Sequence, residues 1–450
     1  MRRTISWATM TEVSPTTGPP ARTATRGQVL AWAMWDFGAT AINAIVITFV
    51  FTVYLTATVG DDLPGDTSPA SWLGRALALA GLVVALLAPV TGVWVNAPAR
   101  RRRALALLTG LVVLLTASMS LIRDDHRYLW PGLVLLACTA ACSELATVPY
   151  NAMLRELSTP ATSGRISGIG LALGYFGSVL ALLVVYLGFI AGDGDTRGLL
   201  GLPVDDGQNV RAAMLLVAAW FALFALPLLI SVPRAPAHDP AERVGFAGAY
   251  RRLWTEVRGE WRRDRNFVYY LGASAVFRDG LTGIFTFGAV LGVTVYGVSQ
   301  ADVLLFGVAA CVVAALGAVV GGRVDDQVGS KPVIVGSLTA MIVVGVVMMT
   351  QSGAAAFWAC GLLLCLFIGP TLSSARTLML RLCAPGKEGV TFGLYTMAGR
   401  AATFLAPWLF SVFIDVFDSQ RAGMGGLLVV LVLGLLLFLP VRAPGRPPIG

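Results

Sequence analysis

The amino-acid sequence predicts an all-α membrane protein with twelve transmembrane helices arranged as two bundles of six. The first observation is composition: 56% of the 450 residues are hydrophobic and 13% are charged, whereas soluble domains average roughly 25% charged residues. The second is that the apolar runs are about 20 residues long, the length that crosses a ~30 Å hydrocarbon core as a helix. Barrel strands alternate in segments of about ten residues, so these runs exclude a β-barrel. The third observation is where the basic residues lie.

Lys and Arg residues lie mainly in alternate connections between the apolar runs. With the N-terminus placed in the cytoplasm, 24 of the 33 fall on the cytoplasmic side, 6 on the other side and 3 inside helices. This excess follows the positive-inside rule and predicts that both chain ends are cytoplasmic, N-in and C-in. The predicted helices span residues 29–57, 71–95, 104–122, 129–153, 165–190, 211–232, 266–292, 302–322, 332–350, 355–382, 389–414 and 423–441.

The longest cytoplasmic connection divides the chain into two halves of six helices. Its Phe246, Tyr250 and Trp261 recur at helical spacing between arginines, which is typical of an amphipathic helix lying on an anionic membrane surface. The alternative is a plain solvated linker. The predicted organisation is a disordered cytoplasmic tail (1–28), an N-terminal bundle (29–232), a linker with an amphipathic helix (233–265), a C-terminal bundle (266–441) and a cytoplasmic tail (442–450).

Composition and motifs also exclude several functions. The net charge of +8 is mostly a topology signal, so we expect no nucleic-acid partner. All six cysteines lie in or beside apolar runs, where free Cys behaves as a small hydrophobe, so we predict no metal site and no cofactor. The sequence contains no P-loop, HExxH motif or nucleophile elbow, and we do not expect an enzyme. The expected partners are the lipid bilayer and a small-molecule substrate, bound by a monomer.

A short motif recurs at matching places in the two halves. The first copy, after predicted helix 2, contains Gly92, Asn96 and Arg100. The second copy, after predicted helix 8, contains Gly322, Asp326, Gly329 and Lys331. We expect the first glycine of each copy to form a tight cytoplasmic turn, and the acid or amide to cap a neighbouring helix N-terminus. The basic residues would hold the turn on the cytoplasmic side.

Six plus six helices with this motif in both halves resemble the major facilitator superfamily. Further segments resemble its vacuole-effluxer-like branch, which is related to autophagy. These segments are "WAMWDFGATAINAIVITFVF", "VPYNAMLREL", "GRISGIGLALGYFGS", "FRDG" and "GPTLSSARTLMLRLCAPGKEGVTFGLYTMAGRAATFLAP". The resemblance implies alternating access and export of small solutes, with amino acids among the candidates. The first motif copy departs from the family, with Asn96 for the usual Asp and Ala99 for the usual Gly, which weakens the expectation of a charged lock there.

Glycine and proline inside the helices predict packing and breaks. Four glycines between 168 and 177 allow close approach of membrane helices, and no strand precedes them as a dinucleotide site would require. Candidate helix breaks lie at Pro89, Pro149, Pro227, Pro370 and Pro407, because the proline ring removes one helical hydrogen bond.

Six charged residues lie well inside the predicted helices, away from the helix ends: Asp36, Glu144, Arg278, Asp279, Arg376 and Arg400. Each costs roughly 2.5–3.5 kcal/mol at a helix centre, so such residues usually face an interior cavity and have partners. Polar residues share their helix faces, as Thr40 and Asn43 do for Asp36 and as Asn151 does for Glu144. The family resemblance implies that helices 1, 4, 7 and 10 line a central cavity, in agreement with these faces.

Depth along the helices separates these charges into two layers. At 1.5 Å per residue, Asp36 and Arg376 lie about 9–10 Å inside the cytoplasmic ends of their helices. Glu144, Arg278 and Arg400 fall near the middle of theirs. We therefore hypothesise a midplane layer of Glu144, Arg278 and Arg400, and a lower layer of Asp36 and Arg376.

These positions define the expected site. The expected substrate contacts are Glu144, Arg278, Arg376, Arg400, Asn43 and Asn151. The expected proton-coupling or gating residues are Asp36, Glu144 and Asp279. Asp279 points about 100° away from Arg278 on the helix, so it can instead bond within its own half. The alternative interpretation is that these charges are ion pairs which orient helices and touch no ligand.

The sequence thus predicts a secondary active transporter that works by alternating access. Arginine matches a carboxylate, so the expected solute is zwitterionic or anionic, and an acid displaced from arginine is a candidate proton carrier. The alternative is a non-transporting receptor or scaffold with the same fold, and a channel is disfavoured because the halves are built to close on each other. Two lysines among many Ala and Arg residues suggest a GC-rich bacterial genome, hence a multi-pass protein of the cytoplasmic membrane.

Overall fold

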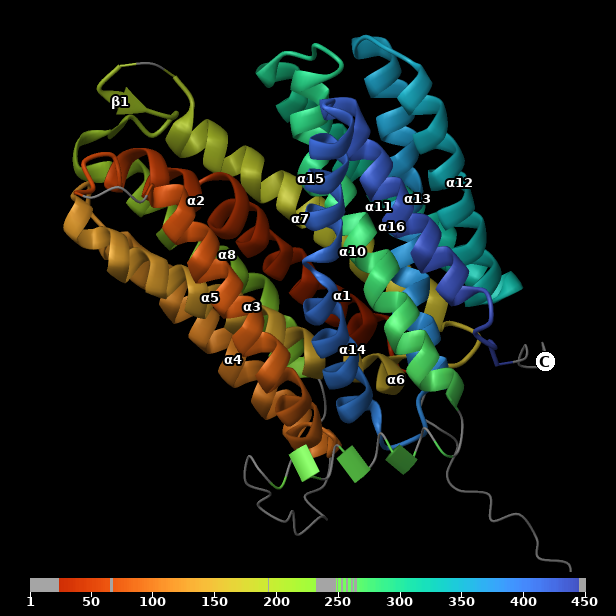
Figure 1. Ribbon diagram of the computed structural model, residues 1–450. Coiled ribbons are helices and arrows are strands. Elements are labelled where there is room, and N and C mark those ends of the chain that lie inside the picture. Colours follow the sequence, from red (N-terminus) through yellow and green to blue (C-terminus); the bar gives the residue numbers. More distant parts are fainter. Residues whose placement is uncertain are drawn as a thin grey trace, which may run out of the picture.

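The computed structural model describes residues 24–64, 68–192, 194–231 and 265–444, with isolated positions from 248 to 262. Most of both predicted tails and of the predicted linker helix lies outside the described residues. Within the described part, twelve helical spans are long and apolar enough to cross a membrane, which confirms the predicted fold class. Figure 1 shows the two bundles side by side, with the N-terminal bundle in red to yellow-green and the C-terminal bundle in green to blue.

The N-terminal bundle contains six spans. Its helices are α1 (Arg26–Ile42), α2 (Phe51–Tyr54), α3 (Pro69–Trp94), α4 (Pro98–Ser118), α5 (Leu129–Ala152), α6 (Leu154–Leu157), α7 (Ser163–Val185) and α8 (Gln208–Ser231). Short π or 3-10 segments extend them: η1 (Asn43–Phe49), η2 (Leu55–Val59), η3 (Met119–Leu121), η4 (His126–Tyr128), η5 (Tyr186–Ile190) and η6 (Asp205–Gly207). Between α7 and α8, β1 (Thr196–Arg197) and β2 (Leu202–Pro203) pair antiparallel.

The C-terminal bundle contains the other six spans. Its helices are α10 (Arg265–Thr294), α11 (Gln300–Val328), α12 (Ser330–Thr350), α13 (Ala354–Leu382), α14 (Glu388–Ala402), α15 (Leu405–Phe417) and α16 (Gln420–Phe438). The eleventh span is divided between α14 and α15. We call the end of the molecule that carries α6 and the start of α14 the inner end, because the predicted topology places it in the cytoplasm.

Local sequence signals explain where several helices begin. α1 starts at a capping box, in which the Thr25 side chain accepts from the amide of Gln28 and the Gln28 side chain accepts from that of Thr25. α3 follows the N-cap Ser68. Pro69 and Pro98 occupy the first positions of α3 and α4, where the missing N–H of proline costs no helical hydrogen bond.

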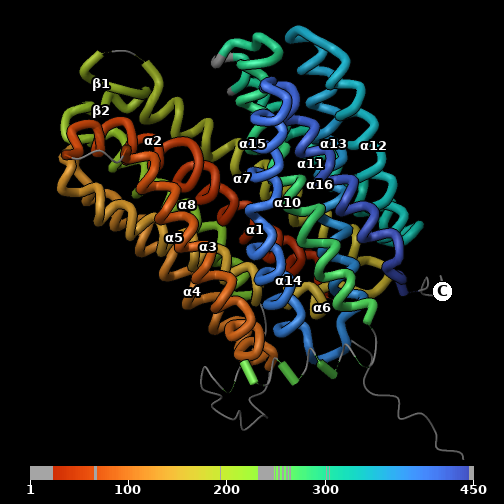
Figure 2. The backbone as a smooth tube through the Cα atoms, in the orientation of Figure 1, coloured from red at the N-terminus to blue at the C-terminus, as the bar shows by residue number. Residues whose placement is uncertain are grey.

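The two bundles contact each other through glycine. α7 packs along α11, and α3 packs along α14. Gly168 of α7 lies against the carbonyl of Ala318, and Gly92 of α3 lies against the carbonyl of Gly389. A Cβ at either glycine would collide with the opposing backbone, so glycine permits this close approach. The bundles diverge from these contacts toward the opposite end, where β1 lies (Figure 2).

The structure corrects the prediction that Gly92 and Gly322 form cytoplasmic turns. Gly92 and Gly322 lie inside α3 and α11 rather than in turns. Gly322 packs against the carbonyl of Gly164 in the other bundle, so helix contact rather than a turn requires the missing side chain. The turn after α11 uses Gly329, whose φ of 92° is accessible to glycine.

We predict that Gly168→Leu destabilises the protein, because the added side chain forces α7 away from α11. Overpacking of this kind costs about 1–3 kcal/mol. The matched control is Gly110→Leu, since a Cβ at Gly110 meets no atom within 4 Å. Thermal unfolding in detergent compares the two variants, and equal melting temperatures would contradict the close contact between the bundles.

Candidate functional site

A cavity of about 320 Å³ lies between α1, α3 and α5, and α14 contributes one residue to its wall. Trp35 and several small or aliphatic side chains form its apolar surface. The polar and charged lining residues are Asp36, Thr40, Asn43, Ser143, Glu144, Thr147 and Arg400. The cavity therefore gathers charged residues from both bundles, although most of its wall belongs to the N-terminal bundle.

Glu144 and Arg400 form an ion pair across the two bundles. Glu144 comes from α5 and Arg400 from the last turn of α14. Each side chain is about one third exposed, at 32%, and both line the cavity. A ligand in the cavity can therefore reach both charges without unfolding any helix.

Asp36 also lines the cavity but forms no ion pair among the described residues. The hydroxyl of Thr40 donates to the main-chain oxygen of Asp36 at 2.8 Å. Its carboxyl group lies beside Gly174 of α7 and is attracted by the charge of Arg376. The hypothesised lower layer of Asp36 and Arg376 therefore contains no direct ion pair in the described part of the chain, and it stays a prediction.

Arg376 of α13 reaches into the N-terminal bundle. Its Nε donates to the Ser167 hydroxyl at 2.9 Å, its Nη2 to the Ser167 carbonyl at 2.6 Å and its Nη1 to Asn151 Oδ1 at 3.3 Å. The guanidinium also lies 5.2 Å from the ring of Trp32, which stacks on Tyr150 at 4.5 Å. With 9% of its surface exposed, Arg376 is a buried cation whose hydrogen bonds join the bundles.

Arg278 neither pairs with Glu144 nor lines the cavity, so its place in the hypothesised midplane layer with Glu144 and Arg400 stays a prediction. Its Nη1 donates to the Tyr395 carbonyl at 3.2 Å, and its guanidinium lies 4.0 Å from the Tyr395 ring. Gly399 leaves room for this side chain, because a Cβ there would touch the guanidinium. Arg278 is therefore held within the C-terminal bundle.

Asp279 and Asn43 occupy two irregular points of the helices. The Asp279 carboxylate accepts from the main-chain amide of Ala406 at 2.6 Å, so it bonds within the C-terminal bundle. Asn43 begins the π segment η1 and lines the cavity. Single-turn π segments occur frequently at functional sites.

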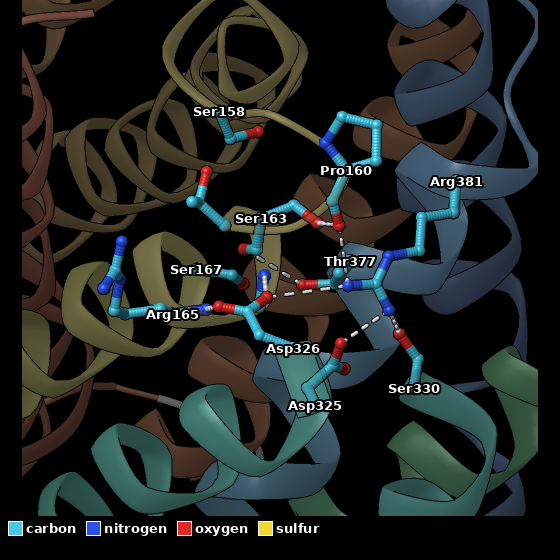
Figure 3. Close-up of polar contacts among 12 residues, drawn as sticks. Ser158, Pro160, Ser163, Arg165, Ser167, Asp325, Asp326, Ser330, Thr377 and Arg381 are labelled. Carbon is cyan, nitrogen blue, oxygen red and sulfur yellow. Dashed lines mark hydrogen bonds and ion pairs between the residues drawn. The ribbon is translucent and has the colours of Figure 1, made fainter. Parts of the chain in front are cut away.

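The second motif copy joins the bundles at the inner end. Asp326 accepts from the amides of Gly164 and Arg165 at 2.8 and 3.0 Å, and so caps the N-terminus of α7 as predicted. Arg381 lies 2.6 Å from Asp325 and 3.6 Å from Asp326. Figure 3 shows these side chains converging from α7, α11 and α13.

The first motif copy uses different residues from those predicted. The side-chain oxygen of Asn96 is buried and has no hydrogen-bond partner among the described residues, so the predicted amide cap is absent. Arg101, rather than Arg100, is the buried basic residue, and one of its bonds is to the Asn96 carbonyl at 3.1 Å. Lys331 of the second copy donates to the Leu439 carbonyl at 2.7 Å.

At the first motif copy, four charged residues that were not predicted form a cluster of ion pairs. Arg101 binds Glu156 at 2.7 Å and Glu388 at 2.9 Å, and Arg155 binds Glu388 at 2.6 Å. Arg101 and Glu388 are almost fully buried. Glu388 is the first residue of α14, so an acid at the start of this helix takes the place of the Asp missing at position 96. In the sequence, the signal for this cluster was the position of Glu388 directly before the predicted apolar helix 389–414.

The comparisons with known proteins agree with this architecture. Residues 155–444 match the family described as Vacuole effluxer Atg22 like. The chain belongs to this family. The Bacillus subtilis (strain 168) protein named uncharacterized MFS-type transporter YxiO is 21% identical over 408 residues, which cover 90% of this chain and 93% of the relative. Autophagy-related protein 22 of Cryptococcus neoformans is 26% identical over 366 residues, or 72% of this chain and 61% of the fungal protein.

Solved structures support the same fold at low identity. The proton:xylose symporter XylE gives a TM-score of 0.70 with 16% identity, over 91% of this chain and 94% of XylE. FucP in the outward conformation gives 0.68 with 14% identity, over 93% of this chain and 99% of FucP. This family member is thus a multi-pass membrane transporter of the major facilitator type. No group of three or more His, Cys, Asp or Glu residues that could hold a metal ion occurs among the described positions.

We predict that Glu388→Gln strongly destabilises the protein, because it leaves Arg101 and Arg155 with one acid in a buried cluster. Breaking a buried ion pair costs on the order of 3 kcal/mol or more. Glu156→Gln is the matched control, since the Glu156 side chain is 37% exposed and Arg101 keeps Glu388 as a partner, so we expect a smaller loss of stability. Denaturant unfolding of the two variants tests the difference, and similar losses would show that Glu388 does not organise the cluster.

Proposed function

We propose that this protein is a secondary active transporter that moves a small zwitterionic or anionic solute, with amino acids as the first candidates, in exchange for or together with protons. We also propose that it acts in the cytoplasmic membrane of a bacterium. The observation that carries the transport mechanism is the Glu144–Arg400 ion pair, which joins the bundles at the wall of the cavity. A solute that competes for this pair would change the attraction between the bundles.

The closed inner end supports alternating access. Arg376, Asp326 and the Arg101–Glu388 pair each connect the N-terminal bundle to the C-terminal bundle at that end. An inward-facing state has to break all of these contacts. The arrangement therefore corresponds to one state of a two-state cycle, in which the cavity is separated from the cytoplasm by buried polar contacts.

The charges of the cavity favour a zwitterion among the proposed solutes. The lining contains two acids, Asp36 and Glu144, and one base, Arg400. A carboxylate on the solute would bind the planar guanidinium of Arg400, which releases Glu144. An ammonium group would then compensate Glu144 or Asp36. A purely anionic solute needs a proton to compensate the released acid, which is one way to couple proton and solute movement.

The alternative function is a receptor or scaffold that does not transport. A buried ion pair is weak evidence for stability, because apolar residues of similar volume often stabilise a protein as well or better. Ligand binding therefore explains why Glu144 and Arg400 lie at a cavity, whereas a scaffold would have no need of these charges. Reconstituted protein under a pH gradient, screened with labelled amino acids, peptides and organic anions, separates the two functions. Absence of both uptake and ligand-dependent thermal shift would favour the scaffold.

We predict that Arg400→Gln lowers solute uptake into proteoliposomes by about tenfold, equivalent to ~1.4 kcal/mol. The physical reason is the loss of the guanidinium that receives the solute carboxylate. Arg323→Gln is the control, because Arg323 is an exposed arginine at the end of α11 and does not line the cavity. If the two variants transport equally well, Arg400 is not a substrate contact.

We predict a matched order among three solutes built on one amino acid that is transported. The free zwitterion should be bound best, because its N-acetyl derivative lacks the ammonium group and its methyl ester lacks the carboxylate. Thermal stabilisation of the purified protein measures the order at equal concentrations. Stabilisation by the N-acetyl derivative that equals or exceeds that by the zwitterion would favour an anionic substrate instead.

A further inference from the structure

The eleventh span is broken near its middle. α14 ends at Ala402 and α15 begins at Leu405, with Thr403 and Phe404 between them. Pro407 explains the break, because its ring lacks an N–H and collides with the carbonyl one turn earlier. As the third residue of α15, the proline is tolerated in a first turn. The predicted membrane span 389–414 is thus confirmed, and the break lies beside Pro407, one of the predicted candidate break positions.

The two segments of this span have their main contacts in different bundles. α14 packs mainly along α3 of the N-terminal bundle and also contacts α5 and, in its own bundle, α10. α15 packs mainly against α16 of its own bundle and also contacts α10. Figure 1 shows α15 above α14 in the same blue part of the chain. Within this single span, the inner segment packs against both bundles, chiefly the N-terminal one, whereas the main contacts of the outer segment are with the C-terminal bundle.

Asp279 is located at the joint between these segments. The amide of Ala406 belongs to the first turn of α15, where main-chain N–H groups have no helical partner. The carboxylate of Asp279 accepts from this amide at 2.6 Å and is 4% exposed. Within the described part of the chain it forms no ion pair, so the N-terminus of α15 is its main compensation. Its neighbour in sequence, Arg278, is held by Tyr395 of α14.

The joint is also adjacent to the ion pair of the cavity. Arg400 lies in the last turn of α14, directly before the break, and pairs with Glu144 of the opposite bundle. Residues 278 and 279 of α10 thus contact both sides of the joint, with Arg278 on α14 and Asp279 on α15. Any bend at the joint has to move Arg400 relative to α10.

We propose that Asp279 is a positioning residue for Arg400, and that the joint it caps is a hinge on which α14 swings between the bundles while α15 stays on α16. The hinge is inferred from the contacts at the joint. Its effect on solute binding rests on the proposed transport function. The cap fixes the start of α15 on α10, so that α14 presents Arg400 to Glu144 when the inner end is closed. Loss of the cap weakens the pair and favours separation of the bundles.

The first test measures the hinge without any solute. Spin labels at Arg103→Cys and Gln327→Cys, two exposed positions at the inner ends of the two bundles, are introduced after the six native cysteines have been replaced. We expect Asp279→Leu to shift the interspin distances toward longer values. Asp415→Asn, an exposed acid on α15, should leave the distances unchanged. An unchanged distribution in Asp279→Leu would overturn the hinge, even if the protein proves not to be a transporter.

The second test asks whether Asp279 acts through Arg400. We expect Asp279→Leu and Arg400→Gln each to raise the half-saturating solute concentration by about tenfold, and the double variant by little more than either, because residues acting on one interaction are not additive. Asp279→Asn keeps an oxygen acceptor and should recover most of the loss. Multiplicative effects would overturn the positioning role, as would an Asn variant that is no better than Leu.

Pro407→Ala keeps the test decisive if Asp279→Leu does not fold. Alanine removes the cause of the break, so we expect the same lengthening of distances as for Asp279→Leu, in a protein whose buried carboxylate is retained. Wild-type distances in Pro407→Ala would contradict a hinge at this joint. Solute uptake that is normal in Asp279→Leu would reject the positioning role while leaving the proposed transport function intact.

Discussion

A charge inside a membrane needs a partner, and in this protein several of the partners lie in the opposite bundle. Glu144 of the N-terminal bundle has Arg400, Arg376 of the C-terminal bundle has Ser167 and Asn151, and Asp326 has the first amides of α7. Because an unpaired charge in the hydrocarbon region is costly, separating the bundles requires that each of these groups finds water or a ligand. The contacts that make the charges tolerable are therefore the contacts that resist opening.

The acids that join the two bundles come from different bundles at the inner end and at the cavity. At the inner end the acids Asp326 and Glu388 come from the C-terminal bundle, and their donors α7, Arg101 and Arg155 come from the N-terminal bundle. At the cavity the acid comes from the N-terminal bundle and the arginine from the C-terminal one. A small solute in the cavity can compete only for the Glu144–Arg400 pair, since the charged residues of the inner end do not line the cavity. Opening at the inner end therefore has to follow from movement of the bundles rather than from direct displacement.

The sequence was sufficient for the fold class, because apolar length and basic residues in alternate connections are set by the membrane itself. It also located Glu144 and Arg400, since each lies within an apolar run. Helical periodicity shows which face a residue occupies but not which group opposes it, so it could not show that Arg278 bonds to the Tyr395 carbonyl of its own bundle. Similarly, four consecutive arginines at 100–103 point in different directions, and only the packing of α4 reveals that Arg101 is the buried one.

The two membrane spans that join the bundles differ: α7 is continuous, whereas the eleventh span is broken between α14 and α15. α7 is continuous from Ser163 to Val185, and its glycines contact α1 on one face and α11 on the other, so an unbroken helix joins the bundles on this side. The other joining helix is broken at Thr403 and Phe404, where no continuous hydrogen-bond ladder transmits force. In the proposed hinge, a movement of the bundles therefore bends the eleventh span at this break, whereas α7 has no break at which to bend. Since Arg400 lies directly before that break, the Glu144–Arg400 pair lies beside the proposed hinge, where a change in the angle between α14 and α15 alters how Arg400 is presented to Glu144.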